Sequence, residues 1–140
     1  MATKLLITRS MNAYSVPKRN ILVVDDDALV CETVTMILRM DGHHVATAGS
    51  GAEALAAFEP GKFDLVFTDY FMPVMTGGEL ATAIKNRSPR QPIVVLTAYP
   101  EQLQSRDQCL AAVDLFIGKP FEIASLREAV TRFPAAQAHL

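Results

Sequence analysis

Short runs of branched apolar residues, repeated along the chain, constrain the fold more than any other feature of this sequence. Runs with little alternation between apolar and polar positions are typical of strands buried on both faces of a parallel sheet. The segments between them are long enough for a helix and a right-handed crossover, which parallel strands require. We expect strands at residues 21–24, 63–67, 93–96 and 115–117, and a further short strand, the second along the chain, at 44–47.

Amphipathic segments between the runs carry start and stop signals for helices. Apolar side chains recur at helical spacing from Val30 to Leu38, before Asp41–Gly42 supplies a stop. Ser50 and Thr76 each stand three residues before a Glu, which is the capping-box pattern at the start of a helix. For five strands alternating with five helices, the flavodoxin-like order 2-1-3-4-5 is a common doubly wound α/β arrangement. The expected helices cover about residues 28–41, 50–59, 76–87, 100–110 and 123–133.

Length and composition indicate one soluble globular domain, since the chain has 140 residues, of which 50% are hydrophobic and 20% charged. No apolar stretch approaches the roughly 20 residues that span a bilayer, so we expect a cytoplasmic protein without a membrane partner. The net charge is −2, but four basic residues before residue 20 leave −6 on the remainder, which argues against nucleic-acid binding. We expect a basic, flexible leader at residues 1–19, a folded unit at 20–134 and a flexible tail at 135–140.

Cysteine and histidine residues do not form a recognisable metal site. Cys31 and Cys109 are the only cysteines, and each falls in an expected helix, which predicts two reduced thiols. His43 and His44 have no acid or cysteine at ligand spacing, so we place them at the entry to the second strand.

Polar side chains stand where the expected strands end. Asp25 and Asp26 follow the first run, Asp69 the third, Thr97 the fourth and Lys119 the last. Because the carboxyl ends of parallel strands share one rim, these five side chains are expected to converge. Carboxylates suit Mg²⁺ or Mn²⁺, an Asp beside the metal can attack phosphorus, and a lysine and a hydroxyl can bind phosphoryl oxygens. The pattern therefore predicts a site for a hard cation and a phosphoryl group.

Four motifs surround these residues, in this order: Val23–Asp27, Asp64–Gly77, Leu96–Ala98 and Lys119–Phe121. Together they resemble the receiver domain of two-component response regulators, and the resemblance covers residues 20 to about 134. It implies that Asp69 is the phospho-acceptor. It also implies that the metal ligands are Asp25, Asp26, Asp69 and the backbone carbonyl of Phe71.

The same resemblance implies roles for residues of the last two motifs. Thr97 is similar to the switch hydroxyl that turns toward the phosphoryl group, and Phe116 to the aromatic side chain that moves with it. Lys119 is similar to the phosphate-binding lysine, and the Lys119–Pro120 bond is expected to be cis, as in the family. Phe71 and Tyr99 are bulky at positions that flank the acceptor, so we expect them to screen it from water and slow the loss of phosphate.

A receiver implies protein partners and a switch, not a turnover enzyme. A histidine kinase or histidine phosphotransfer protein would donate the phosphoryl group, and the surface formed by residues 100–110, 115–117 and 123–133 would then control a downstream target. The chain would act as a monomer or as a phosphorylation-promoted homodimer. If it is complete, it is a stand-alone regulator with no appended DNA-binding or enzymatic domain.

Two other functions compete with this interpretation. A pseudo-receiver would keep the fold as a binding module without phosphorylation, but such modules typically lose the acceptor, an acid or the lysine, and all are present here. A small aspartate-nucleophile phosphatase of the haloacid-dehalogenase type would also place acids at Asp25 and Asp27, after the first strand. Its motif requires Thr two residues further on, where Leu29 stands. Asp27 is instead expected to cap the first helix.

Overall fold

The computed structural model describes residues 17–98 and 108–133. Several expectations fall outside these ranges: the leader at residues 1–19 apart from its last three residues, the tail at 135–140, Tyr99, and nearly all of the helix expected at 100–110. Among the described residues, no helix combines the length and the apolar character needed to cross a membrane.

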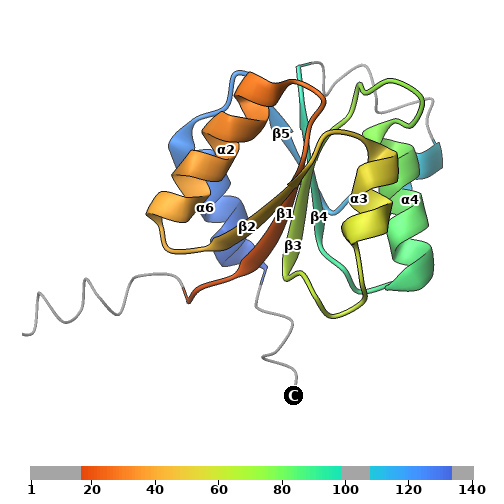
Figure 1. Ribbon diagram of the computed structural model, residues 1–140, viewed down its shortest axis with the longest axis horizontal. Coiled ribbons are helices and arrows are strands. Elements are labelled where there is room, and N and C mark those ends of the chain that lie inside the picture. Colours follow the sequence, from red (N-terminus) through yellow and green to blue (C-terminus); the bar gives the residue numbers. More distant parts are fainter. Residues whose placement is uncertain (1–16, 99–107, 134–140) are drawn as a thin grey trace, which may run out of the picture.

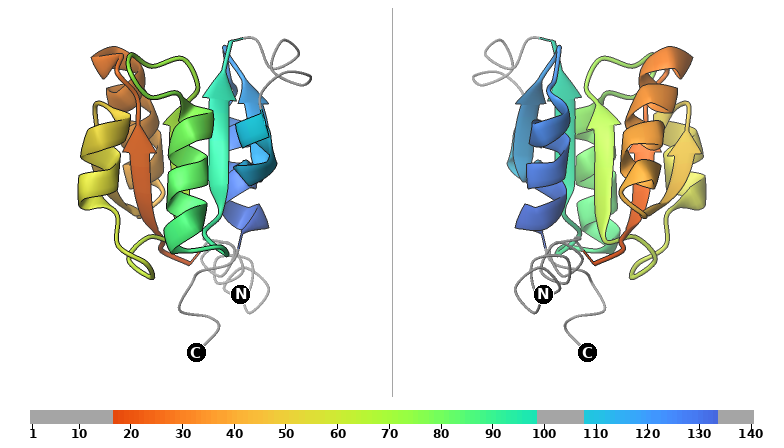
Figure 2. Two further views of the ribbon diagram at one scale, coloured as in Figure 1. Left: turned by 90° about the vertical axis from the view of Figure 1, so that its right-hand side faces the viewer. Right: turned by 90° about the vertical axis from the view of Figure 1, so that its left-hand side faces the viewer.

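The centre of the fold is a five-stranded parallel sheet in the order β2-β1-β3-β4-β5, as the sequence predicts. All strands run the same way, so their carboxyl ends lie at one edge, which is the upper edge in Figure 2. The strands are β1 (Asn20–Val24), β2 (His44–Ala48), β3 (Leu65–Asp69), β4 (Ile93–Thr97) and β5 (Leu115–Gly118).

Helices cover both faces of the sheet, as Figure 1 shows. α2 (Ala28–Met40) and α6 (Ile123–Arg132) lie on one face, and α3 (Gly51–Ala57) and α4 (Gly77–Arg87) on the other. Successive side chains of a strand point to opposite faces, so β1 contributes to both layers of the core. Its residues 21 and 23 pack in the cluster with α2 and α6, and residues 22 and 24 in the cluster with α3 and α4.

The third strand differs from the expected one at both ends. It begins at Leu65 instead of residue 63 and extends to Asp69, so that the expected acceptor is the last residue of the strand. Asp64 precedes the strand and makes two hydrogen bonds to Asn20: its N–H donates to the Asn20 carbonyl at 2.7 Å, and its carboxylate accepts from the Asn20 N–H at 2.8 Å. These contacts anchor the start of β1, which explains a buried acid within an apolar run.

Helix starts follow the expected signals with one difference. Asp27 caps α2 by accepting from the N–H groups of Leu29 and Val30, and Thr76 forms a complete capping box with Glu79. The Ser50 cap is only half of a capping box, because the Glu53 carboxylate accepts instead from the Gly49 N–H at 3.3 Å.

The five expected helices are therefore confirmed in part. Four α-helices lie within the described ranges. Of the helix expected at residues 100–110, only the end is described, where a short 3-10 helix, η1 (Gln108–Ala112), precedes β5.

Candidate functional site

Three carboxylates meet at the carboxyl rim of the sheet because β1 and β3 are neighbours. Asp25 and Asp26 follow β1, and Asp69 ends β3. One ligand oxygen from each of the three lies within 4.8 Å of the others. Asp25 and Asp69 are buried, whereas Asp26 is exposed. The rim thus brings together all three acids that the sequence assigns to the site, with an opening toward solvent on the Asp26 side.

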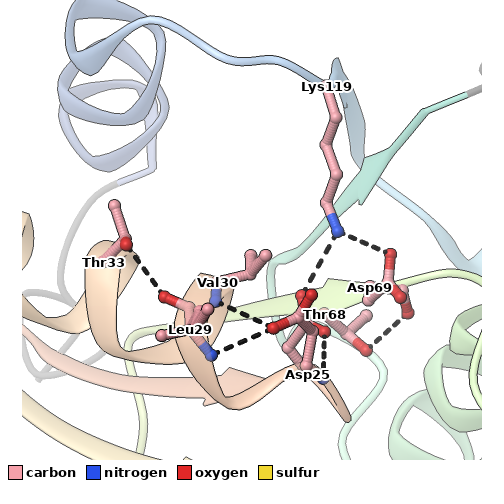
Figure 3. A network of polar contacts seen from close by, with 8 residues as sticks. Asp25, Leu29, Val30, Thr33, Thr68, Asp69 and Lys119 are labelled. Atoms are coloured by element: carbon pink, nitrogen blue, oxygen red, sulfur yellow. Dashed lines mark hydrogen bonds and ion pairs between the residues drawn. The ribbon is translucent and has the colours of Figure 1, made fainter.

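Lys119 reaches the same point from the loop after β5. Its Nζ lies 3.0 Å from Oδ1 of Asp69 and 3.3 Å from Oδ2 of Asp25, as Figure 3 shows. Its backbone N–H donates to the Thr97 carbonyl at 2.8 Å, which holds the loop against the end of β4. The Lys119–Pro120 peptide bond is cis. The lysine is therefore fixed at both its backbone and its ammonium group.

Burial and neighbouring charges shift the pKa values of two groups in the site, Asp69 and Lys119. Burial raises the pKa of the Asp69 carboxyl; the hydrogen bond from Lys119 acts in the opposite direction, and the charge of Asp25 adds to the rise. Burial alone would lower the pKa of Lys119, but its contacts with Asp69 and Asp25 outweigh burial, and the pKa is raised. Three carboxylates around one ammonium leave an excess of negative charge at the rim.

This donor set fits a hard divalent cation. Mg²⁺ takes oxygen ligands and usually binds through one or two carboxylates together with water and phosphate oxygens. Asp25 is already positioned, because its Oδ1 accepts a hydrogen bond from the Asp27 N–H at 2.9 Å. A cation between the acids would also offset the repulsion by Asp25, which adds to the effect of burial in raising the pKa of Asp69. The geometry, the oxygen chemistry and the charge all agree with such an ion.

The other expected site residues lie on β4, on β5 and in the loop after β3. Thr97 ends β4, next to β3, and its side chain is fully buried. Phe116 is half-buried in β5 and packs against a small cluster that contains Tyr70 and Val95. Phe71 is 51% exposed and contacts Tyr70 edge to face, with 4.9 Å between ring centroids.

The loop between β3 and α4 contains two features that the sequence analysis did not single out. A Cβ on Gly77 would lie 2.2 Å from the Asp69 carbonyl oxygen, so only glycine fits, and the Gly77 N–H donates to the Tyr70 carbonyl at 2.8 Å. Val74 has a φ of 72° in a tight turn closed by a 2.8 Å hydrogen bond from the Met75 N–H to the Pro73 carbonyl. A glycine directly after a capping Thr was the available signal for the first feature; nothing local signals the second.

Comparison with known proteins identifies relatives with the same fold. The family model described as "Response regulator receiver domain" matches residues 21–131. The chain is 35% identical over 116 residues to the probable transcriptional regulatory protein TcrX of Mycobacterium tuberculosis; the match covers 82% of this chain but only 48% of TcrX. The chain therefore spans about half the length of this relative.

Solved structures give the same result. The response regulator TrrA of Thermotoga maritima, in complex with Mg²⁺ and BeF, superposes with a TM-score of 0.75 at 35% identity, covering 81% of this chain and 97% of TrrA. TrrA in complex with the histidine kinase ThkA superposes with a TM-score of 0.72 at the same identity and coverage. The family model matches most of the length of this chain, and the chain has the same fold as these structures. This chain therefore belongs to the response regulator receiver domain family.

Proposed function

We propose that this chain is a phosphorylation-dependent switch, in which Asp69 accepts a phosphoryl group from a histidine kinase or a histidine phosphotransfer protein. The observation that carries the proposal is the convergence of Asp69 with Asp25 and Asp26, within 4.8 Å, and with the Lys119 ammonium at 3.0 Å. Phosphoryl transfer requires mainly positioning and charge stabilisation, and this rim offers both.

In the proposed step, a carboxylate oxygen of Asp69 forms a bond to phosphorus while the bond from phosphorus to the donor's imidazole nitrogen breaks. The electron pair of that bond stays on the imidazole, which takes up a proton from solvent. Bound Mg²⁺, held by Asp25, Asp26, Asp69 and the Phe71 carbonyl, would supply charge neutralisation for the phosphoryl oxygens. Lys119 would transfer its ion pair from the Asp69 carboxylate to the phosphoryl group.

The response to phosphorylation would pass from the rim to β5 and α6. We assign Thr97 as the switch hydroxyl and Phe116 as the aromatic side chain that moves with it. Phe116 packs against the cluster of Tyr70 and Val95, and Tyr70 is the residue after the acceptor, so this cluster offers a packing route from Asp69 to β5. The surface of β5 and α6, together with residues 100–110, would then bind a downstream target protein. This chain would do so either as a monomer or as a homodimer that phosphorylation promotes.

The relatives support this proposal at different levels. TrrA is in complex with Mg²⁺ and BeF in one structure and with the histidine kinase ThkA in another. The proposed receiver unit covers residues 20–134 and acts as a switch without turnover. A cytoplasmic location, where ATP feeds histidine kinases, follows from the same proposal.

Phe71 would control how long the phosphorylated form lasts. Its ring stands two residues after the acceptor and is held edge to face on Tyr70, where it can restrict the approach of water to Asp69. Tyr99, which lies outside the described residues, is proposed to act with it. Replacing both with small polar residues should speed the loss of phosphate; unchanged or slower decay would contradict this role.

Phosphorylation by a small donor tests the central proposal. The protein is incubated with acetyl phosphate and Mg²⁺, and intact mass is followed over time, with Asp69→Asn as the matched control because the amide keeps the shape of the acceptor. We expect the mass gain of one phosphoryl group in the wild type and none in the variant. If the wild type shows neither this mass gain nor Asp69-dependent binding of fluoroberyllate, the result would favour a pseudo-receiver that keeps the fold as a binding module.

A further inference from the structure

The loop between β3 and α4 is closed at its base. The Gly77 N–H donates to the Tyr70 carbonyl at 2.8 Å, and Gly77 lies so close to the Asp69 carbonyl that a Cβ has no room there. The base of the loop is therefore tied to the end of β3. Phe71, whose backbone carbonyl is a proposed metal ligand, follows directly after the base. Its position depends on how the rest of the loop is held.

The tip of this loop has a strained backbone. Val74 has a φ of 72°, which crowds the Cβ of a β-branched residue, and its side chain is fully exposed. The 2.8 Å hydrogen bond from the Met75 N–H to the Pro73 carbonyl closes the turn around Val74. A strained conformation of this kind persists only where the surrounding structure holds it. Contacts of neighbouring residues are therefore needed to hold the tip.

Met75 supplies such a contact by packing against the start of α3. A Cβ on Gly51, the first residue of that helix, would lie 2.5 Å from Sδ, 2.9 Å from Cγ and 3.0 Å from Cβ of Met75. The methionine thus lies directly against the glycine backbone, and a larger residue at position 51 would displace it. Met75 is half-buried and packs against the core cluster that contains α3 and α4, so this contact ties the tip of the loop to the core.

The segment before α3 also contacts the other side of the acidic centre. The Asp25 N–H donates to the carbonyl of Ala48, the last residue of β2, at 3.1 Å. Residues 48–51 therefore contact the backbone of Asp25 at one end and the tip of the loop at the other. Both segments that carry the proposed metal ligands Asp25 and Phe71 are thus held by the same turn, at the edge of the sheet toward which the strand arrows point in Figure 2.

We propose that the contact between Gly51 and Met75 positions the Phe71 carbonyl for a divalent cation, so that Gly51 and Met75 are positioning residues of the metal site. The proposal rests on the proposed function, in which the acidic centre binds Mg²⁺ with this carbonyl among the ligands. If the contact is lost, the loop can turn about its closed base and carry the carbonyl away. Asp69 belongs to β3 and stays in place. Loss of the contact should therefore weaken metal binding while the acids remain together.

A metal titration of four variants tests the proposal. Mn²⁺ is the probe, because it takes the same oxygen ligands as Mg²⁺ and EPR measures the concentration of the free ion. Gly51→Ala displaces Met75, Met75→Ala removes its side chain, and a double variant combines the two changes. Gly49→Ala is the matched control. It makes the same chemical change at an exposed position, where the nearest atom to the new Cβ would be a Glu53 carboxylate oxygen at 3.5 Å, an ordinary contact.

Gly51→Ala should raise the dissociation constant for Mn²⁺ about tenfold, as is typical when a group that orients a metal ligand is lost. Met75→Ala should raise it by a similar factor. This variant adds no atom, so it decides the question if Gly51→Ala does not fold. The double variant should bind more tightly than the two separate effects predict, because alanine at position 75 leaves room for the new methyl group. Gly49→Ala should stay within about twofold of the wild type.

An unchanged dissociation constant in the Gly51 and Met75 variants, or additive effects in the double variant, would overturn the proposal. Fewer binding sites per chain at an unchanged dissociation constant would also overturn it, because that result indicates a role in folding alone.

Labelling of the wild type by acetyl phosphate, measured in parallel, separates this proposal from the proposed function. If the wild type binds Mn²⁺ and is labelled at Asp69 while the variants bind Mn²⁺ equally well, the positioning role fails and the proposed function stands. Labelling without Mn²⁺ binding would also overturn the positioning role, because there would be no metal to position. If the wild type neither binds Mn²⁺ nor is labelled, the proposed function itself fails.

Discussion

Aspartates stand at both ends of the sheet, and the two ends use them in different ways. At the amino end, Asp64 and Asp114 precede β3 and β5, and each accepts a 2.8 Å hydrogen bond from the first N–H of the neighbouring strand, at Asn20 and Ile93. At the carboxyl rim, the acids that end β1 and β3 face one another and share a single ammonium group. At the amino end, backbone N–H groups donate hydrogen bonds to the acids. At the carboxyl rim, the acids concentrate negative charge.

The difference shows what an aspartate contributes in each place. A carboxylate that accepts hydrogen bonds from backbone N–H groups stabilises the fold, because the buried charge and the buried donors satisfy one another. A carboxylate that faces other carboxylates costs stability until a cation or a ligand binds. We therefore expect that removing the charge of an aspartate lowers the free energy of unfolding at the amino end and raises it at the carboxyl rim.

The largest expected effect tests the amino end. Asp64→Ala should lower the free energy of unfolding by about 2–3 kcal/mol, because the Asn20 N–H loses a charged acceptor in a buried position. Urea unfolding followed by circular dichroism measures the change. Asp64→Asn keeps an oxygen acceptor and should lose less than half as much. If Asp64→Ala lowers the free energy of unfolding by less than about 1 kcal/mol, the aspartate at the amino end does not stabilise the fold as we expect.

The second prediction tests the rim. Asp69→Asn should raise the free energy of unfolding by about 1 kcal/mol without divalent metal, because it removes a buried charge from among like charges but keeps an oxygen for Lys119. Thermal unfolding in a chelator, and then in Mg²⁺, measures the effect. The wild type should gain more from Mg²⁺ than the variant. A variant less stable than the wild type in the chelator would show that the rim acids stabilise the fold.

A third prediction concerns a buried histidine at the amino end. His43 accepts a 3.0 Å hydrogen bond from the Arg19 N–H through Nδ1, and burial lowers the pKa of its ring. The unfolded state therefore binds a proton more readily than the folded state does. The contribution of neutral His43 to stability is complete above the pKa of an unfolded histidine, ~6.5, and is lost as the pH falls from there through the lower pKa of the folded state. Melting temperatures of His43→Gln should depend less on pH below this point than those of the wild type. His44→Gln, at an exposed position, is the control and should keep the wild-type slope.

The smallest expected effect concerns the second amino-end aspartate. Lys85 contacts Asp114 at 2.8 Å, with side chains 20% and 34% exposed, so solvent screens the pair. Lys85→Met should lower the free energy of unfolding by only about 0.5 kcal/mol, whereas Asp114→Ala should lose more because the Ile93 N–H also loses its acceptor. Chemical denaturation of both variants measures the difference. Equal losses would mean that the ion pair, not the backbone contact, is the stabilising interaction.

Particular residues show how far the sequence could predict the site. Asp25, Asp26 and Asp69 were expected at one rim because short apolar runs identify parallel strands, and the rule on carboxyl ends then places the acids together. The start of β3 was predicted two residues too early, because Asp64 is held by a hydrogen bond to a residue 44 positions away. The strain at Val74 was not predicted, because β-branched residues ordinarily avoid positive φ.

The sequence by itself determined the order and type of the elements, the strand order and the membership of the acidic site. These follow from patterns that repeat within a dozen residues: runs of apolar residues, helical spacing and caps. Only the tertiary structure decided that Lys119 pairs with both Asp25 and Asp69, that Asp69 is buried, and that Val74 has a positive φ in the loop after β3. Such contacts depend on how distant segments pack, because burial and charge arise from neighbours that are remote in the chain.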